Sequence, residues 1–97
     1  MSRFLGDVAQ GVDEQIAYSV TTTAWGSTPT SVGVVVKNSA GTDVTSTVAS
    51  GSASVTGDII TLPVIKSLTA GEVYRVEVKF TVSGNILECY FRIAAET

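Results

Sequence analysis

The chain has 97 residues with six basic and nine acidic side chains, a formal charge of −3 that is spread along its length. A chain of this length forms one domain whose core needs no metal or disulfide support. We expect no nucleic-acid partner, because neutralising a phosphate backbone requires clustered cations.

Residues 1–13 carry one arginine and one apolar pair, Phe4-Leu5. Neither this segment nor a later one can form a secretory signal or a membrane span, so we expect a protein kept in the cytosol before assembly, with no membrane partner. The sequence predicts a flexible N-terminal arm over residues 1–13, either a frayed terminus or a segment that orders on a neighbouring subunit. The folded domain is expected over residues 14–95.

Alternating apolar residues predict strands over residues 14–21 and 31–38. Trp25 lies in the polar connection between them, where we expect its ring to cap one end of the core, with a binding-surface aromatic as the alternative. The glycine-containing stretch 39–42 then predicts a hairpin loop that leads into a third strand over residues 43–48.

The small, polar residues 49–57 predict a short edge strand around Val55. A further strand is expected over residues 58–65, with Pro63 on the opposite parity from its apolar neighbours. Proline has no N–H to donate, so Pro63 must turn its nitrogen away from the ladder or lie at a bulge. We therefore expect this strand near a sheet edge.

The stretch 68–74 and the strand that follows it organise the chain. Apolar residues at every second position from Tyr74 to Val82 predict a strand with one dry and one wet face. In front of it, a leucine, a glycine and a tyrosine have the spacing of a tyrosine corner, in which the phenol closes a hydrogen bond back to the turn.

The last strand is expected over residues 86–94. If Gly84 and Asn85 form a two-residue loop, facing residues have numbers that sum to 169, so Phe80 pairs with Cys89. Cys89 is the one cysteine of the chain and cannot form an internal disulfide. Its place on the apolar phase of the strand predicts a buried, inert thiol.

About seven short strands separated by regular turns predict an all-β fold, an immunoglobulin-like Greek-key β-sandwich. Fibronectin type III and bacterial Ig-like modules are the nearest comparison, because the chain has no Cys-Trp-Cys pattern. We expect no enzyme: without histidine the chain lacks the usual general base and metal ligand. The spacing of its carboxylates, cysteine and glycines predicts no metal, cofactor or phosphate site.

From Trp25 onward the chain reads W, P-T-S-V-x-V-x-V, A-G-T-D-V-T, G-D-I-I-T-L-P and L-T-A-G-E-x-Y-R-V-E-V-x-F before a closing apolar strand. This arrangement resembles small Ig-like proteins encoded among the virion genes of tailed bacteriophages and prophages. The resemblance implies a structural component of the head, the head-tail connection or the tail. Its implied partners are other virion proteins, with self-association as an open alternative, and its implied location is the virion. The resemblance transfers no functional residues.

Apolar side chains on the predicted solvent phase favour the same interpretation, because clustered together they would form a contact patch. The candidate contact residues are Val35, Val73, Tyr90 and Trp25, with Ile59 and Ile65 on the outward parity of the strand over 58–65. A particle component should assemble into a symmetric ring or decorate a lattice.

The competing class is an Ig-like adhesion or carbohydrate-binding accessory module of a bacterial surface protein. Such modules normally stand in long secreted chains, and the short chain without a signal favours the virion interpretation. Sugar binding would also need an aromatic platform, for which only Trp25 and Tyr90 remain outside the predicted core. A domain without any partner is a third possibility.

Overall fold

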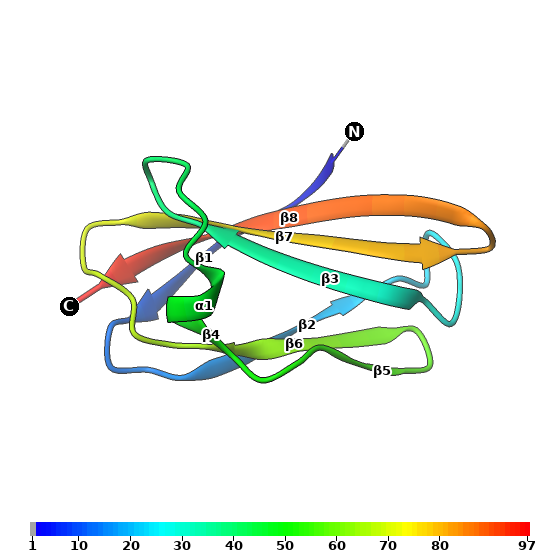
Figure 1. The fold of residues 1–97 in the computed structure, drawn as a ribbon, viewed down its shortest axis with the longest axis horizontal. Coiled ribbons are helices and arrows are strands. Elements are labelled where there is room, and N and C mark those ends of the chain that lie inside the picture. Colours follow the sequence, from blue (N-terminus) through cyan, green and yellow to red (C-terminus); the bar gives the residue numbers. More distant parts are fainter. Residues whose placement is uncertain (1) are drawn as a thin grey trace.

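The chain folds into two β-sheets packed face to face (Figure 1), in a computed structural model that describes residues 2–97, with side chains from Phe4 onward. Sheet A has the strand order β1 (Ser2–Gly11), β8 (Asn85–Glu96), β7 (Val73–Val82) and β3 (Thr30–Lys37). Sheet B has the order β2 (Ile16–Thr21), β6 (Ile59–Ile65) and β4 (Ala49–Ser50), with β5 (Ser54–Thr56) also paired to β6. The predicted all-β sandwich is confirmed.

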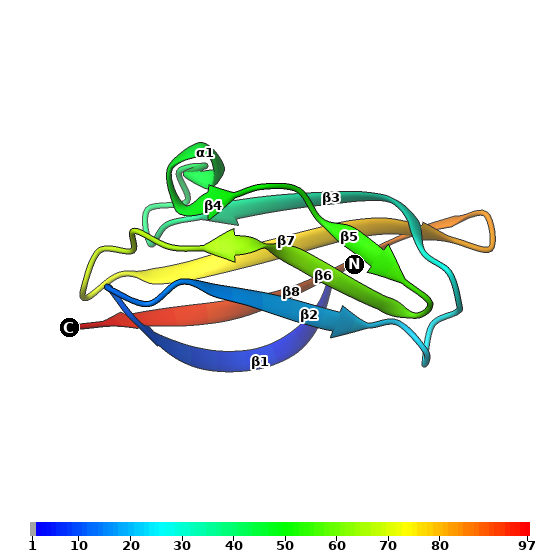
Figure 2. The ribbon, with the colours of Figure 1, turned by 90° about the horizontal axis from the view of Figure 1, so that it is seen from below.

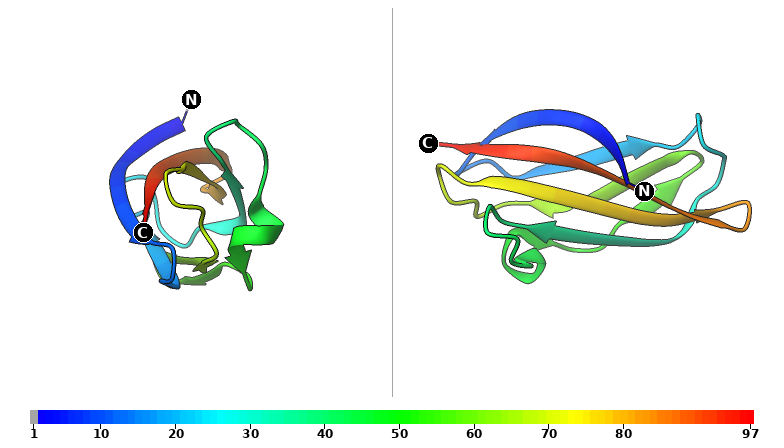
Figure 3. Two further views of the ribbon diagram at one scale, coloured as in Figure 1. Left: turned by 90° about the vertical axis from the view of Figure 1, so that its left-hand side faces the viewer. Right: turned by 90° about the horizontal axis from the view of Figure 1, so that it is seen from above.

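Strand β1 is the main departure from the prediction. Residues 2–11 were expected in a flexible arm, but they form a strand that runs parallel to β8 along the edge of sheet A (Figures 2 and 3). The described part of the chain therefore contains eight strands instead of about seven. Met1 lies outside the described residues.

A buried glutamine fastens the end of β1 to sheet B. Gln10 is 1% exposed, and its Nε2 donates hydrogen bonds to the backbone oxygens of Ile65 at 2.8 Å and Glu14 at 3.0 Å. Its Oε1 accepts a hydrogen bond from the Tyr18 hydroxyl at 2.7 Å. Burial and the nearby Glu14 carboxylate raise the pKa of Tyr18 above its usual value of 10.0. These bonds satisfy a polar group whose burial would otherwise be costly.

Strand β7 supplies the centre of the core, as its alternation predicts. Tyr74, Val76, Val78, Phe80 and Val82 are all buried, whereas the residues between them lie on the outer face. The tyrosine corner is also confirmed, because the backbone N–H of Thr69 donates a hydrogen bond of 2.8 Å to the Tyr74 hydroxyl.

The predicted register of the β7–β8 hairpin is wrong by two residues. Val82 faces Asn85, so the loop is Ser83-Gly84, and Cys89 lies opposite Val78. Both loop residues have positive φ, 49° and 81°, which matches the twist of a tight hairpin. A shift of two residues keeps every side chain on its predicted face. Cys89 is therefore buried, as expected.

Strand β6 is central in sheet B, so its predicted place near an edge is wrong. It pairs with β2 on one side and with β4 and β5 on the other. Leu62 and Pro63 together lie opposite Tyr18, so Pro63 is accommodated at a bulge, one of the two predicted solutions. The bulge reverses the parity of the strand, and Ile65 is fully buried instead of facing outward.

The third strand, predicted over residues 43–48, is absent. One bridge, Lys37 with Asp43, is followed by a single helical turn, α1 (Thr45–Val48). The Asp43 carboxylate accepts hydrogen bonds from the Thr45 N–H and hydroxyl, and such local bonds compete with a β-ladder. The short strand predicted around Val55 is present as β5.

Candidate functional site

The outer face of sheet A gathers charged and aromatic side chains from four strands. One row across the sheet consists of Lys37, Arg75, Arg92 and Asp7 on β3, β7, β8 and β1. The neighbouring row consists of Val35, Glu77, Tyr90 and Phe4 on the same strands. All eight side chains are partly or largely exposed. The surface is thus contributed by residues far apart in the sequence.

Each arginine of this face lies over an aromatic ring. The Arg75 guanidinium carbon is 3.7 Å from the centre of the Tyr90 ring, and that of Arg92 is 4.8 Å from the centre of the Phe4 ring. The two rings are in contact, with centroids 5.1 Å apart. Such cation–π contacts restrict the orientation of a guanidinium while leaving it charged.

Each of these arginines also forms an ion pair with a carboxylate. Arg75 Nε donates to Glu77 at 2.7 Å, and Arg92 Nε donates to Asp7 at 2.9 Å. Lys37 lies 3.6 Å from the second oxygen of Glu77. Among the described residues both guanidiniums donate through Nε, which leaves their terminal amino groups available to a partner.

The pairing of Arg75 with Arg92 sets two positive charges directly opposite each other on adjacent strands. Like charges in this position destabilise a sheet. An unfavourable pair of this kind in an otherwise regular strand pair is expected at functional positions.

The charges of the molecule are unevenly divided. The outer face of sheet A carries four basic and three acidic side chains: Lys37, Arg75, Lys79, Arg92, Asp7, Glu77 and Glu88. The other described side chains that are charged at neutral pH are one basic residue and six acidic ones: Lys66, Asp13, Glu14, Asp43, Asp58, Glu72 and Glu96. The face is therefore weakly positive on a molecule that is otherwise acidic.

Three of the predicted contact residues lie on this face. Val35 and Tyr90 are in the same row on either side of Glu77, and Val73 lies beyond the row of basic residues. The predicted patch does not extend to Ile59, which is 44% exposed on sheet B, or to Ile65, which is buried. The face is thus a mixed surface of arginine, aromatic and valine side chains.

Trp25 lies away from this face. Its ring is half-buried and stacks on Phe80, with centroids 5.8 Å apart and planes inclined by 23°. The ring covers one end of the core, as predicted for a tryptophan in this connection.

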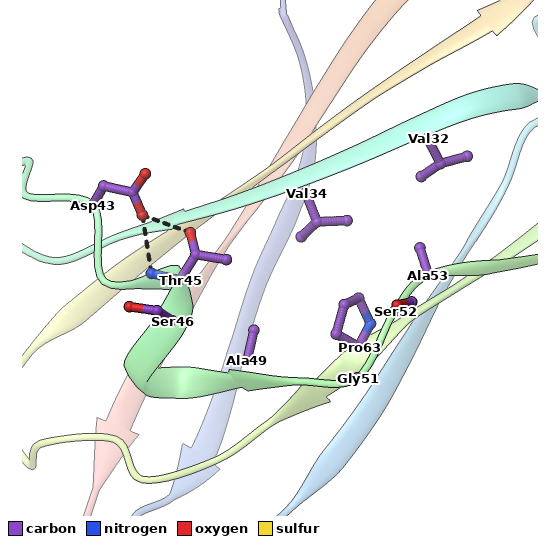
Figure 4. Close-up of a pocket in the computed structure, with 10 residues that line it drawn as sticks. All are labelled: Val32, Val34, Asp43, Thr45, Ser46, Ala49, Gly51, Ser52, Ala53 and Pro63. Carbon is purple, nitrogen blue, oxygen red and sulfur yellow. Dashed lines mark hydrogen bonds between the residues drawn. The ribbon is translucent and has the colours of Figure 1, made fainter.

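A groove of about 590 Å³ lies between the outer edge of β3 and the segment from α1 to β5 (Figure 4). Its walls include Val32 and Val34 on one side and Ala49, Ala53 and Pro63 on the other. Asp43 lies at one end, where hydrogen bonds from Thr45 hold the pKa of its carboxyl below the usual value of 3.8. These bonds keep the carboxylate turned toward its own turn (Figure 4), so the groove shows no converging set of polar groups.

Within residues 2–97, no group of three or more histidine, cysteine, aspartate or glutamate side chains is placed to hold a metal ion. No helix in this part of the chain has the length and apolar character needed to cross a membrane. Comparison of the sequence with protein-family models and with curated proteins finds no match.

Sequence reasoning missed two features of the site, the Phe4 ring and the pairing of Arg75 with Arg92. Phe4 belongs to a segment without alternation, and the apolar pair Phe4-Leu5 was its only signal. The Arg75–Arg92 pair depends on the hairpin register, and the predicted register set Glu77 opposite Arg92 instead.

Proposed function

We propose that this chain is a non-enzymatic structural protein of a tailed-bacteriophage or prophage virion. It acts through protein–protein contacts in the head, the head-tail connection or the tail. Its sandwich is of the immunoglobulin-like type, an assignment supported by the tyrosine corner of Tyr74 and by the division of strands between the two sheets. The resemblance to phage proteins supports the virion as the location of the chain. The outer face of sheet A supports contact with another protein as its mode of action.

The observation that carries the proposal is the pair of arginines stacked on Tyr90 and Phe4 at the outer face of sheet A. Arginine and aromatic residues are enriched in protein interfaces and dominate their binding energies. The surface is an exposed sheet face, whereas small-molecule sites are usually concave and apolar. This geometry suits contact with another folded protein.

The same contacts argue against the carbohydrate-binding alternative. A sugar platform needs an open ring face, but the Arg75 guanidinium covers the Tyr90 ring and the Trp25 ring stacks on Phe80. No described feature favours an adhesion module over a particle component.

The proposal is tested by purifying particles from cells that encode the chain and measuring its copy number by quantitative mass spectrometry. A virion component should be present in a fixed ratio to the major particle proteins and should stay bound through density-gradient purification. An abundant cytosolic protein of the same cells is the control for carry-over. Absence of the chain from purified particles would sink the virion assignment.

A further inference from the structure

We propose that the outer face of sheet A binds the acidic end of a second copy of this chain, in a head-to-tail contact. The basic row of the face is defined as Lys37, Arg75 and Arg92. The acidic end is defined as Asp13, Glu14, Glu72 and Glu96. The inference concerns the isolated chain and does not depend on the virion role.

The basic row has the properties of a preorganised anion-binding surface. Its two guanidiniums are held by rings on one side and by carboxylates at Nε, so little side-chain freedom is lost when their terminal amino groups bind an anion. A carboxylate that bridges Arg75 and Arg92 would also relieve the repulsion between two directly opposed cations.

The complement to this row is present on the same chain. The turn after β1, the turn before β7 and the end of β8 meet at one end of the sandwich, at the left of Figure 1. Backbone hydrogen bonds join them, from Val12 N to Glu96 O at 2.8 Å and from Ala95 N to Glu72 O at 3.0 Å. These segments carry four carboxylates, and Lys66, at the start of the connection before β7, is the one basic side chain among them. Charge complementarity therefore selects a second copy as the occupant of the face.

The two surfaces differ, so the contact is heterologous, and repetition of it produces a ring or an open filament. The molecule measures 40 × 24 × 21 Å, so an end-on contact covers on the order of 500 Å² on each partner, less than the roughly 800 Å² of a standard interface. A single contact is therefore weak, and we expect dissociation constants between about 10 µM and 1 mM.

The experiment is sedimentation velocity of the full chain over a concentration series up to about 1 mM, at about 10 mM and about 1 M salt. The Debye length falls from about 30 Å to about 3 Å between these conditions. Self-association should be strong at low salt and lost at high salt. A chain that is monomeric throughout at low salt would overturn the inference.

Two variants identify the surfaces. The face variant carries Arg75→Gln and Arg92→Gln, and the end variant carries Asp13→Asn and Glu96→Gln. Each alone should associate at least about tenfold more weakly than the parent. Lys66→Gln removes a positive charge outside the face, in the connection before β7. Because this change makes the acidic end more acidic, it should leave the association unchanged or strengthen it, in contrast to the face variant. Circular dichroism checks that each variant is folded.

A mixture of the two variants separates a face-to-end contact from a face-to-face dimer. Each variant keeps one intact surface, so the mixture should form 1:1 heterodimers and nothing larger. A face-to-face dimer would be lost in the face variant and kept in the end variant, and that result would overturn the inference. A monomeric chain that is nevertheless present in purified particles would overturn this inference alone, whereas a self-associating chain absent from particles would overturn the virion role alone.

Discussion

The β7–β8 hairpin and β1 lie in the same sheet, but their places in it have different origins. The hairpin combines strict alternation with a two-residue loop, and all five inner side chains of β7 are buried. Strand β1 has a register shift between Phe4 and Asp7, and the glutamine Gln10 is its one buried side chain from Phe4 onward. Alternation suffices to specify a central strand, whereas this edge strand is positioned by polar and aromatic contacts with distant segments.

The largest loss of stability should come from a core substitution in the β7–β8 hairpin. Phe80→Ala removes a fully buried ring from the centre of β7 and should lower the free energy of unfolding by about 3–5 kcal/mol in urea titrations. Ile86→Ala, at a residue 68% exposed near the loop, is the control and should stay within about 0.5 kcal/mol of the parent. A Phe80 loss below about 1 kcal/mol would contradict the central role of this strand.

A substitution that detaches β1 should cost less stability, and its effect should be confined to this strand. Gln10→Ala removes the side-chain donor to the backbone oxygens of Ile65 and Glu14 and the acceptor of the Tyr18 hydroxyl, and should cost about 1–3 kcal/mol. Hydrogen exchange should show loss of protection in β1 while β7 stays protected, because edge segments open independently of the core. Gln15→Ala, at an exposed glutamine, is the matched control. Equal loss of protection in both strands would show that β1 is integral to the core.

The tyrosine corner sharpens the comparison, because it connects β7 to the preceding turn by one hydrogen bond. Tyr74→Phe removes the acceptor of the Thr69 N–H and should destabilise the protein by about 1 kcal/mol in thermal or urea unfolding. Tyr90→Phe removes the same atom from the outer face of sheet A and serves as the control. Equal effects of the two changes would mean that the corner bond adds nothing specific.

The smallest effect is expected in the hairpin loop. Ser83 has φ of 49°, which serine tolerates less well than asparagine, so Ser83→Asn should stabilise the protein by roughly 0.2–0.5 kcal/mol. Gly84→Ala should act in the opposite direction, because Gly84 has φ of 81°. Differential scanning calorimetry would detect both shifts, and a destabilising Ser83→Asn would count against the observed loop.

Most of the fold could be predicted from the sequence, because parity along each strand decides which face is buried. Parity could not predict the strand register where two registers bury the same side chains. Loops at Ser83-Gly84 and Gly84-Asn85 give the same faces, so alternation could not distinguish the two registers. The bulge at Pro63 could be anticipated from its missing N–H, but the central position of β6 depends on strands that pair from elsewhere.

The candidate site was predictable only in part. Parity identified Val35, Val73 and Tyr90 as outward residues, and the structure sets all three on one face. The Arg75–Arg92 pair needed the correct register, and Phe4 needed the parallel pairing of β1 with β8. Such long-range pairings leave no local signal in the sequence.

The parallel pairing of β1 with β8 also has a kinetic consequence. The Asp7–Arg92 ion pair joins residues 85 positions apart, so pairing these strands closes a loop of almost the whole chain. Contacts of this kind raise the mean sequence separation of contacting residues, which correlates with slower folding. Closure of β1 onto β8 would then be a late event, and until it occurs the edge of β8 is free to pair with another chain.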